Sequence, residues 1–131
     1  MADVLLLVGL PGSGKTHLGN NYLESGWYFF DDPKSLEEIR SAIEMGLPVV
    51  IADPHFCLTN RRETAQKLLE AWGATVKCVF FKNEPVQCAK NVRRRDDARK
   101  VFDTISLYTR NYEIPEGARQ LSVWRPDLHG V

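Results

Sequence analysis

Several features that would direct a chain to a membrane or to a polyanion are missing from this sequence. Basic and acidic residues are equal in number, 17 of each, so the formal net charge is zero and no global attraction to nucleic acid or an anionic membrane is indicated. The apolar run near the start, Val4 to Val8, is too short for a signal peptide or a membrane span. We therefore expect a cytoplasmic protein with no membrane partner, in which any anion is bound by a local cluster of residues.

Cysteine and histidine are also scarce. The three cysteines (Cys57, Cys78 and Cys88) are odd in number and show no paired spacing, which argues against a disulfide framework and favours a reducing compartment. The three histidines lie far apart along the chain, so no metal-binding cluster is expected from them.

The 131 residues suit one domain, and no repeats or linkers divide residues 1–131. Short apolar runs alternate with amphipathic segments, a pattern that predicts an α/β fold with a parallel sheet of four or five strands and helices on both faces. Strands are expected at 4–8, 27–30, 49–52 and 75–81. Residues 120–124 are either a fifth strand or an extended tail. Helices are expected at 15–24, between Ser35 and Gly46, from a Thr59 cap to Gly73, at 85–92, and from an Asp103 cap through Tyr112.

The strongest motif follows the first expected strand. Gly9-Leu10-Pro11-Gly12-Ser13-Gly14-Lys15-Thr16 fits the phosphate-binding pattern G-x-x-x-x-G-K-[ST]. Glycines allow the backbone N–H groups to turn toward phosphate oxygens, Lys15 is expected to reach the β- and γ-phosphates, and Thr16 is expected to bind magnesium. The expected nucleotide contacts are Gly9, Pro11, Gly12, Ser13, Gly14, Lys15, Thr16 and His17. The alternative is a glycine-rich turn with an incidental lysine.

Aspartates follow the second and third expected strands, at the sheet edge where ligands bind in open α/β folds. Asp53 is expected to hold magnesium or to orient an arginine, unless it is only a turn residue before Pro54. Asp31 or Asp32 can accept the proton of an acceptor hydroxyl, and we favour Asp31 because it lies nearest the strand. The alternative for this pair is a solvated turn. His55 is a candidate to line the same site or a surface residue.

A charge-dense stretch with four arginines follows the helix expected at 85–92. Guanidinium groups can bind a transferring phosphoryl group, so Arg93, Arg94 and Arg95 predict a lid over residues 93–100 that closes on ATP. A solvated helix end is the alternative explanation for such a run.

Together, the loop, the Asp53 segment and Lys90-Asn91-Val92-Arg93-Arg94 resemble the kinase domain of phage polynucleotide kinase and the wider set of small P-loop kinases. The likeness extends from residue 1 to about Gly117. It implies a three-layer P-loop NTPase fold, with Asp31 at the position of the general base, Asp53 as the second aspartate and Arg94 as the lid arginine. Lys34 stands where the family has arginine, Pro33 intrudes, and the stretch before the third strand is shorter. The resemblance therefore carries over to the donor side, whereas it leaves the acceptor open.

We expect an ATP-dependent phosphotransferase that moves the γ-phosphate of magnesium-bound ATP to an acceptor hydroxyl. The expected catalytic residues are Lys15, Asp31, Asp53 and Arg94, with Thr16 and Asp53 at the metal. The acceptor is a 5′-hydroxyl of a nucleic acid or nucleotide, or a small hydroxyl compound, and the oligomeric state is open. The alternative is a regulatory or complex-bound ATP-binding or ATPase module. A GTPase is disfavoured, because D-x-x-G and N-K-x-D are both missing.

Overall fold

A computed structural model describes residues 2–93 and 95–125 of the chain. A single five-stranded sheet forms its centre, and every strand pair in it is parallel. The strands are β1 (Ala2–Val8), β2 (Tyr28–Asp31), β3 (Val49–Ala52), β4 (Ala74–Phe81) and β5 (Gln120–Leu121), in the spatial order β2-β3-β1-β4-β5. The helices are α1 (Lys15–Glu24), α2 (Arg40–Glu44), α3 (Thr59–Ala71), α4 (Pro85–Val92) and α5 (Ala98–Thr109), with short 3₁₀ turns at Leu36–Ile39 and Pro54–Cys57.

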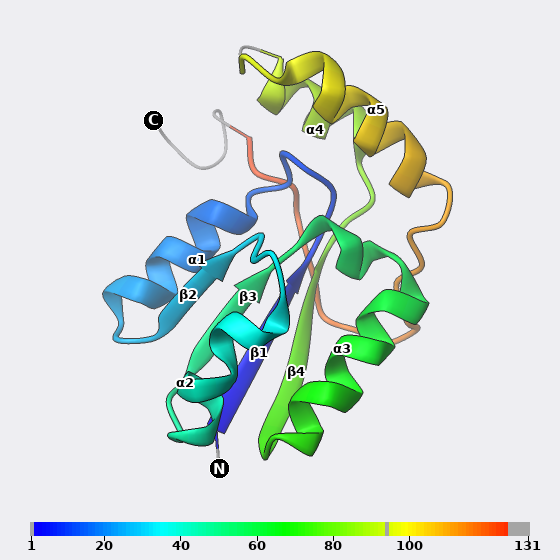
Figure 1. Ribbon diagram of the computed structural model, residues 1–131. Helices are drawn as coiled ribbons and strands as arrows, with labels where there is room; N and C mark the ends of the chain where they lie inside the picture. Colours follow the sequence, from blue (N-terminus) through cyan, green and yellow to red (C-terminus); the bar gives the residue numbers. More distant parts are fainter. Residues whose placement is uncertain (1, 94, 126–131) are drawn as a thin grey trace.

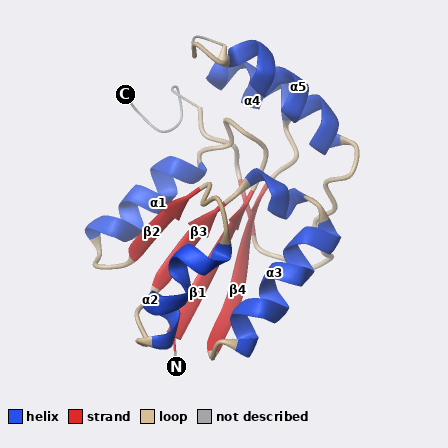
Figure 2. Cartoon of the chain, in the orientation of Figure 1, coloured by secondary structure: helices blue, strands red, loops and turns tan. Residues whose placement is uncertain are grey.

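The central strands are apolar because both of their faces are covered. All four residues of β3 are buried, and so are six of the seven residues of β1. Figures 1 and 2 show α1 on one face of the sheet and α2 with α3 on the other. On the α1 side, Leu18 and Tyr22 pack against the buried side chains of Leu5 and Leu7. The expected three-layer α/β fold is confirmed.

The carboxyl ends of the strands converge below α4 and α5, which contact each other and lie across that end of the sheet (Figure 1). The strands end at Val8, Asp31, Ala52 and Phe81. The Tyr112 hydroxyl, which has one proton to donate, lies within hydrogen-bond reach of the Val8 and Phe81 carbonyl oxygens and fixes the ends of β1 and β4 together.

Three sequence predictions need correction. Helix α5 begins at Ala98, so Asp103 lies inside the helix instead of capping it, because Val101, Ile105 and Tyr108 together form one buried face. Thr59 is the first residue of α3, and Leu58 occupies the cap position.

The helix expected between Ser35 and Gly46 is split into a 3₁₀ turn and a short α2. Residues 120–124, which the sequence left open, form a two-residue strand at Gln120–Leu121 followed by an irregular segment. None of the helices within residues 2–93 and 95–125 has the length and apolar character that crossing a bilayer requires.

Candidate functional site

The Gly9–Thr16 motif forms the connection between β1 and α1. Gly12 (φ 84°) and Gly14 (φ 111°) have left-handed backbone conformations that favour glycine. A Cβ at Gly12 would lie 2.6 Å from the carbonyl oxygen of Cys88, so the loop packs directly on α4. Both the turn and this close packing therefore require glycine at position 12.

Lys15 reaches back across the loop from the first turn of α1. Its Nζ donates to the carbonyl oxygens of Gly9 (2.7 Å) and Leu10 (2.9 Å), and the residue is 8% exposed. Burial lowers the pKa of the Lys15 ammonium, while the neighbouring acidic groups of Cys57, Cys88, Asp31 and Asp53 act in the opposite direction. Two carbonyl oxygens thus hold the Lys15 amino group inside the loop, although burial works against its charged form.

Thr16 and Asp31 meet at the mouth of the loop. The Thr16 hydroxyl donates to Asp31 Oδ2 at 2.9 Å, although the two residues belong to different elements, α1 and β2. Hydroxyl and carboxylate oxygens are the ligand type that magnesium prefers. The Thr16 hydroxyl and the carboxylates at the neighbouring strand ends therefore fit a magnesium ion.

Asp32, Asp53 and His55 form a second polar cluster, in which one ligand atom from each residue lies within 4.8 Å of the others. Asp53 Oδ1 accepts from the His55 backbone N–H (2.8 Å) and lies 2.7 Å from the ring nitrogen His55 Nδ1. Asp32 has a left-handed backbone (φ 50°), which aspartate tolerates. Burial raises the pKa of Asp32, the charges of Asp53 and Asp31 raise it further, and His55 opposes the shift.

From the sequence, Asp32 and Asp53 were expected at one sheet edge and His55 was a candidate to line the same site. The structure brings a ligand atom of each into one group. The cluster forms because β2 and β3 are adjacent in the sheet and end at the same level, with Asp31 opposite Ala52.

A cleft of about 950 Å³ joins the loop, the strand ends and α5. Lys15, Thr16 and His17 lie on the loop side of this cleft, and Asp31, Asp32 and His55 lie at the strand ends. The wall from α5 comprises Lys100, Val101, Thr104 and Tyr108. Of these residues only Lys100 was expected near the nucleotide, as part of the lid, although the three- and four-residue spacing of Val101, Thr104 and Tyr108 places them on one side of a helix.

The predicted lid stretch contributes in part to this cleft. Arg95 lines it and forms two hydrogen bonds of 2.9 Å with the carboxylate of Asp97. Arg93 is exposed and is not among the residues that line the cleft. Arg94 lies outside the described residues. Residues 98–100 belong to α5.

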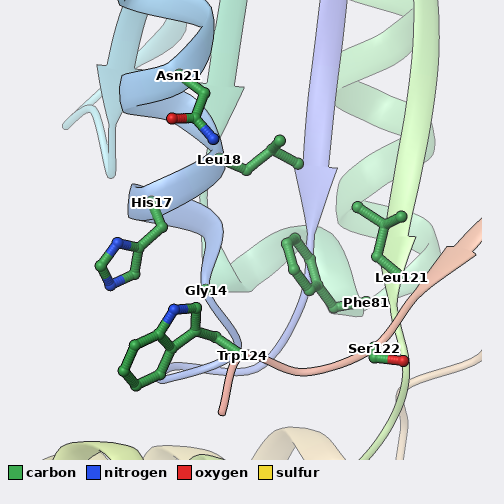
Figure 3. Close-up of a pocket in the computed structure, with 8 residues that line it drawn as sticks. All are labelled: Gly14, His17, Leu18, Asn21, Phe81, Leu121, Ser122 and Trp124. Atoms are coloured by element: carbon green, nitrogen blue, oxygen red, sulfur yellow. The ribbon is translucent and has the colours of Figure 1, made fainter. Parts of the chain in front are cut away.

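A smaller pocket of about 440 Å³ lies beside the loop, between α1 and the segment that follows β5 (Figure 3). The rings of His17 and Trp124 stack there, with centroids 5.0 Å apart and planes 8° from parallel. Asn21, Phe81 and Leu121 line the remainder (Figure 3). Sequence reasoning missed Trp124, which lies in the segment whose structure it left open, and no local pattern links this residue to the loop.

No family model matches the chain. Solved structures resemble it in fold. A gluconokinase from Sinorhizobium meliloti 1021 has a TM-score of 0.62 and 16% identity, covering 95% of this chain and 84% of that one. The APS kinase CysC of Mycobacterium tuberculosis, solved with AMPPNP and APS, has a TM-score of 0.61 and 16% identity, covering 95% and 90%. Kti12 of Chaetomium thermophilum, solved with ADP-AlF3, has a TM-score of 0.55 and 14% identity, covering 91% and 88%.

These likenesses show a shared three-layer α/β fold, that of the P-loop NTPases, whereas the resemblance to phage polynucleotide kinase stays a prediction. A relative in sequence extends the comparison. Uncharacterized protein R277 of Acanthamoeba polyphaga mimivirus is 31% identical over 122 residues, which cover 86% of this chain and 87% of that protein. By this match, the chain belongs to the same family as mimivirus protein R277.

Proposed function

We propose that the protein is an ATP-dependent phosphotransferase, a small P-loop kinase that acts as one domain over residues 1–131. One observation carries the proposal. The Lys15 ammonium is held within the loop by two carbonyl oxygens, next to the Thr16 hydroxyl and the Asp31 carboxylate. A positive charge beside hard oxygen ligands suits a magnesium-bound polyphosphate.

ATP would place its phosphates on the loop N–H groups between Gly12 and Thr16. Magnesium, when bound by the Thr16 hydroxyl and by Asp53, the predicted metal carboxylate, supplies positive charge that offsets the charge on the β- and γ-phosphates. Asp31 is then left to act as the base. The nucleoside base would enter the pocket of Figure 3, whose stacked Trp124 and His17 rings offer an aromatic wall.

In the transfer, the bond between the γ-phosphorus and the bridging oxygen of ADP breaks, and a bond forms from that phosphorus to the acceptor oxygen. The hydroxyl proton passes to the Asp31 carboxylate, and ADP leaves with the pair of electrons. Arg95 and Lys100 line the cleft and can bind the negatively charged phosphoryl group during transfer. Arg94 stays the predicted lid arginine.

Two acceptor classes fit the proposal: a 5′-hydroxyl of a nucleic acid or nucleotide, and a small hydroxyl compound. Incubation with γ-labelled ATP and 5′-hydroxyl DNA, RNA, nucleosides and sugars distinguishes them, because label accumulates on one class. The three cysteines are unpaired thiols, which suits a cytoplasmic setting.

The variant Asp31→Asn tests the proposed base. We expect it to lose transfer by at least about a hundredfold, the usual scale of general-base catalysis, while ATP still binds. Asp103→Asn is the matched control, because Asp103 is exposed on α5 and does not line the cleft. Full transfer by Asp31→Asn together with a loss in Asp32→Asn would overturn the assignment of the base.

A second candidate function is a nucleotide-binding or ATPase module without an acceptor. It is favoured by the short connection between β2 and β3, which holds only a 3₁₀ turn and the five-residue α2. Release of free phosphate without label on any acceptor, unchanged in Asp31→Asn, would support this alternative over the kinase.

A further inference from the structure

Asn91 joins three segments that are distant in the sequence. It lies in the last turn of α4, and its side-chain Nδ2 donates to the carbonyl oxygens of Gly12 (2.8 Å) and Trp124 (2.7 Å). Its Oδ1 accepts from Gln87 Nε2 at 2.9 Å, one turn earlier in the same helix. An asparagine amide has two N–H donors, so both are used between the phosphate loop and the segment after β5.

The two carbonyl groups belong to different walls of the proposed nucleotide site. Gly12 is part of the loop that would hold the phosphates, and Trp124 forms the aromatic wall of the pocket in Figure 3. The Trp124 backbone N–H also donates to the Ser13 carbonyl oxygen at 2.9 Å. The Trp124 residue is therefore bonded through its N–H to the loop and through its C=O to α4.

The segment that carries Trp124 depends on such contacts, because the strand before it is short. Strand β5 pairs with β4 at two positions only, Gln120 with Phe80 and Leu121 with Phe81. Beyond it, the Val123 N–H reaches Glu84 Oε2 at a long 3.3 Å. The bonds to Ser13 and Asn91 are shorter, so they are the contacts best placed to fix the indole beside Gly14.

Space around the loop leads to the same conclusion. A Cβ at Gly14 would lie 2.9 Å from Trp124 Cβ, and one at Gly12 would lie 2.8 Å from Val92 Cγ1 on α4. The loop is thus enclosed between the Trp124 segment on one side and α4 on the other, and Asn91 connects these two sides.

We propose that Asn91 is a positioning residue that couples the phosphate loop to the base-stacking wall, by holding Trp124 in register with Gly12. This inference rests on the proposed function, because it assumes that the loop takes phosphates and the Trp124 pocket takes a base.

The test compares magnesium-bound ATP, which has a base, with magnesium-bound inorganic tripolyphosphate, which has none. Stacking of a base on an aromatic side chain contributes about 1–3 kcal/mol, so Trp124→Ala should weaken ATP binding by about 5- to 150-fold. Each lost neutral hydrogen bond contributes about 1 kcal/mol, or about fivefold. Asn91→Ala loses the bonds to Gly12 and Trp124, so ATP binding should weaken by about 30-fold, whereas tripolyphosphate binding, which depends only on the Gly12 bond, should weaken by about fivefold.

A double-mutant cycle measures the coupling directly. In the Trp124→Ala background, Asn91→Ala should reduce ATP affinity no more than it reduces tripolyphosphate affinity. Asn83→Ala is the matched control. This asparagine precedes α4, donates to the Thr109 carbonyl oxygen and lines neither the cleft nor the pocket, so its loss should leave both affinities unchanged. Asn91→Gln, which keeps the amide but displaces it by one methylene, repeats the test should Asn91→Ala fail to fold.

Equal losses for ATP and tripolyphosphate in Asn91→Ala, or no loss of either, would overturn the inference. Additive effects of Asn91→Ala and Trp124→Ala on the ratio of ATP affinity to tripolyphosphate affinity would overturn the inference as well. Failure of the proposed function looks different, because in that case the unmodified protein would bind neither ligand.

Discussion

Lys15→Met is the most direct perturbation of the phosphate loop, because it removes the ammonium group and keeps an unbranched side chain of similar length. The Lys15 Nζ is buried and bonded to the carbonyl oxygens of Gly9 and Leu10. If the loop binds phosphate, the loss of this charge should lower the affinity for ATP while the variant still folds.

The size of the effect follows from the number of donors. An ammonium has three N–H groups. Two are used at 2.7 and 2.9 Å, and the 3.5 Å contact with Ser13 Oγ is too long to compete for the third, so one donor remains for a phosphate oxygen. A hydrogen bond to a charged group contributes about 1.5–3 kcal/mol. Lys15→Met should therefore weaken binding of magnesium-bound ATP by about 10- to 150-fold.

The fold should tolerate the change. Burial lowers the pKa of Lys15, which means that the surroundings disfavour the charged form, and its removal offsets part of the two lost hydrogen bonds. Calorimetry with ATP and magnesium gives the affinity, and thermal unfolding shows that the variant is folded. Lys67→Met is the control, because it removes the same charge from an exposed position on α3. A folded Lys15→Met protein that binds ATP within about threefold of the unmodified protein would refute the reasoning.

Two further predictions concern stability. Gly12→Ala should destabilise the protein by about 1–3 kcal/mol more than Gly73→Ala, since both glycines have positive φ but only a Cβ at Gly12 meets a backbone oxygen; urea unfolding measures the difference, and equal losses would contradict it. Asp32→Asn should raise the Tm at neutral pH. The pKa of Asp32 is raised in the folded protein, so its ionisation lowers stability as the pH rises from the ordinary aspartate value of 3.8 through the raised one. The rise in Tm caused by Asp32→Asn should become smaller as the pH falls toward 3.8. A lower Tm for the variant at neutral pH would contradict the upward direction of the Asp32 pKa.

Much of the fold could be predicted because its signals are local. The apolar runs of β1 and β3 and the glycines that end α1, α2 and α3 are visible along the chain, and each corresponds to an observed boundary within a residue or two. The start of α5 was misjudged because the charged residues Arg99 and Lys100 hide the first turn, in which Val101 is the buried apolar residue. At this point in the sequence, the charged residues obscured the helical spacing of the apolar ones.

The candidate site likewise combines residues that local sequence motifs predict with contacts that they do not. Lys15 and Thr16 could be assigned from one eight-residue motif, since a loop followed by a helix brings its own N–H groups together. Asp31, Asp32 and Asp53 could be placed at the sheet edge with His55 as a candidate beside them, whereas the close approach of Asp32 to Asp53 and His55 could not be predicted. This contact depends on the pairing of β2 with β3 in the sheet, and no single segment of the sequence indicates the order of the strands.

The sequence by itself determined a parallel α/β sheet and a loop with the chemistry to hold phosphate, because both are set by side-chain periodicity and by glycines at fixed positions. Only the tertiary structure decided that Trp124 stacks on His17 and that Asn91 bonds to Gly12 and Trp124. Such contacts join segments that meet only after the sheet has formed, and a polar amide or an indole carries no local sign of the distant backbone that it will contact.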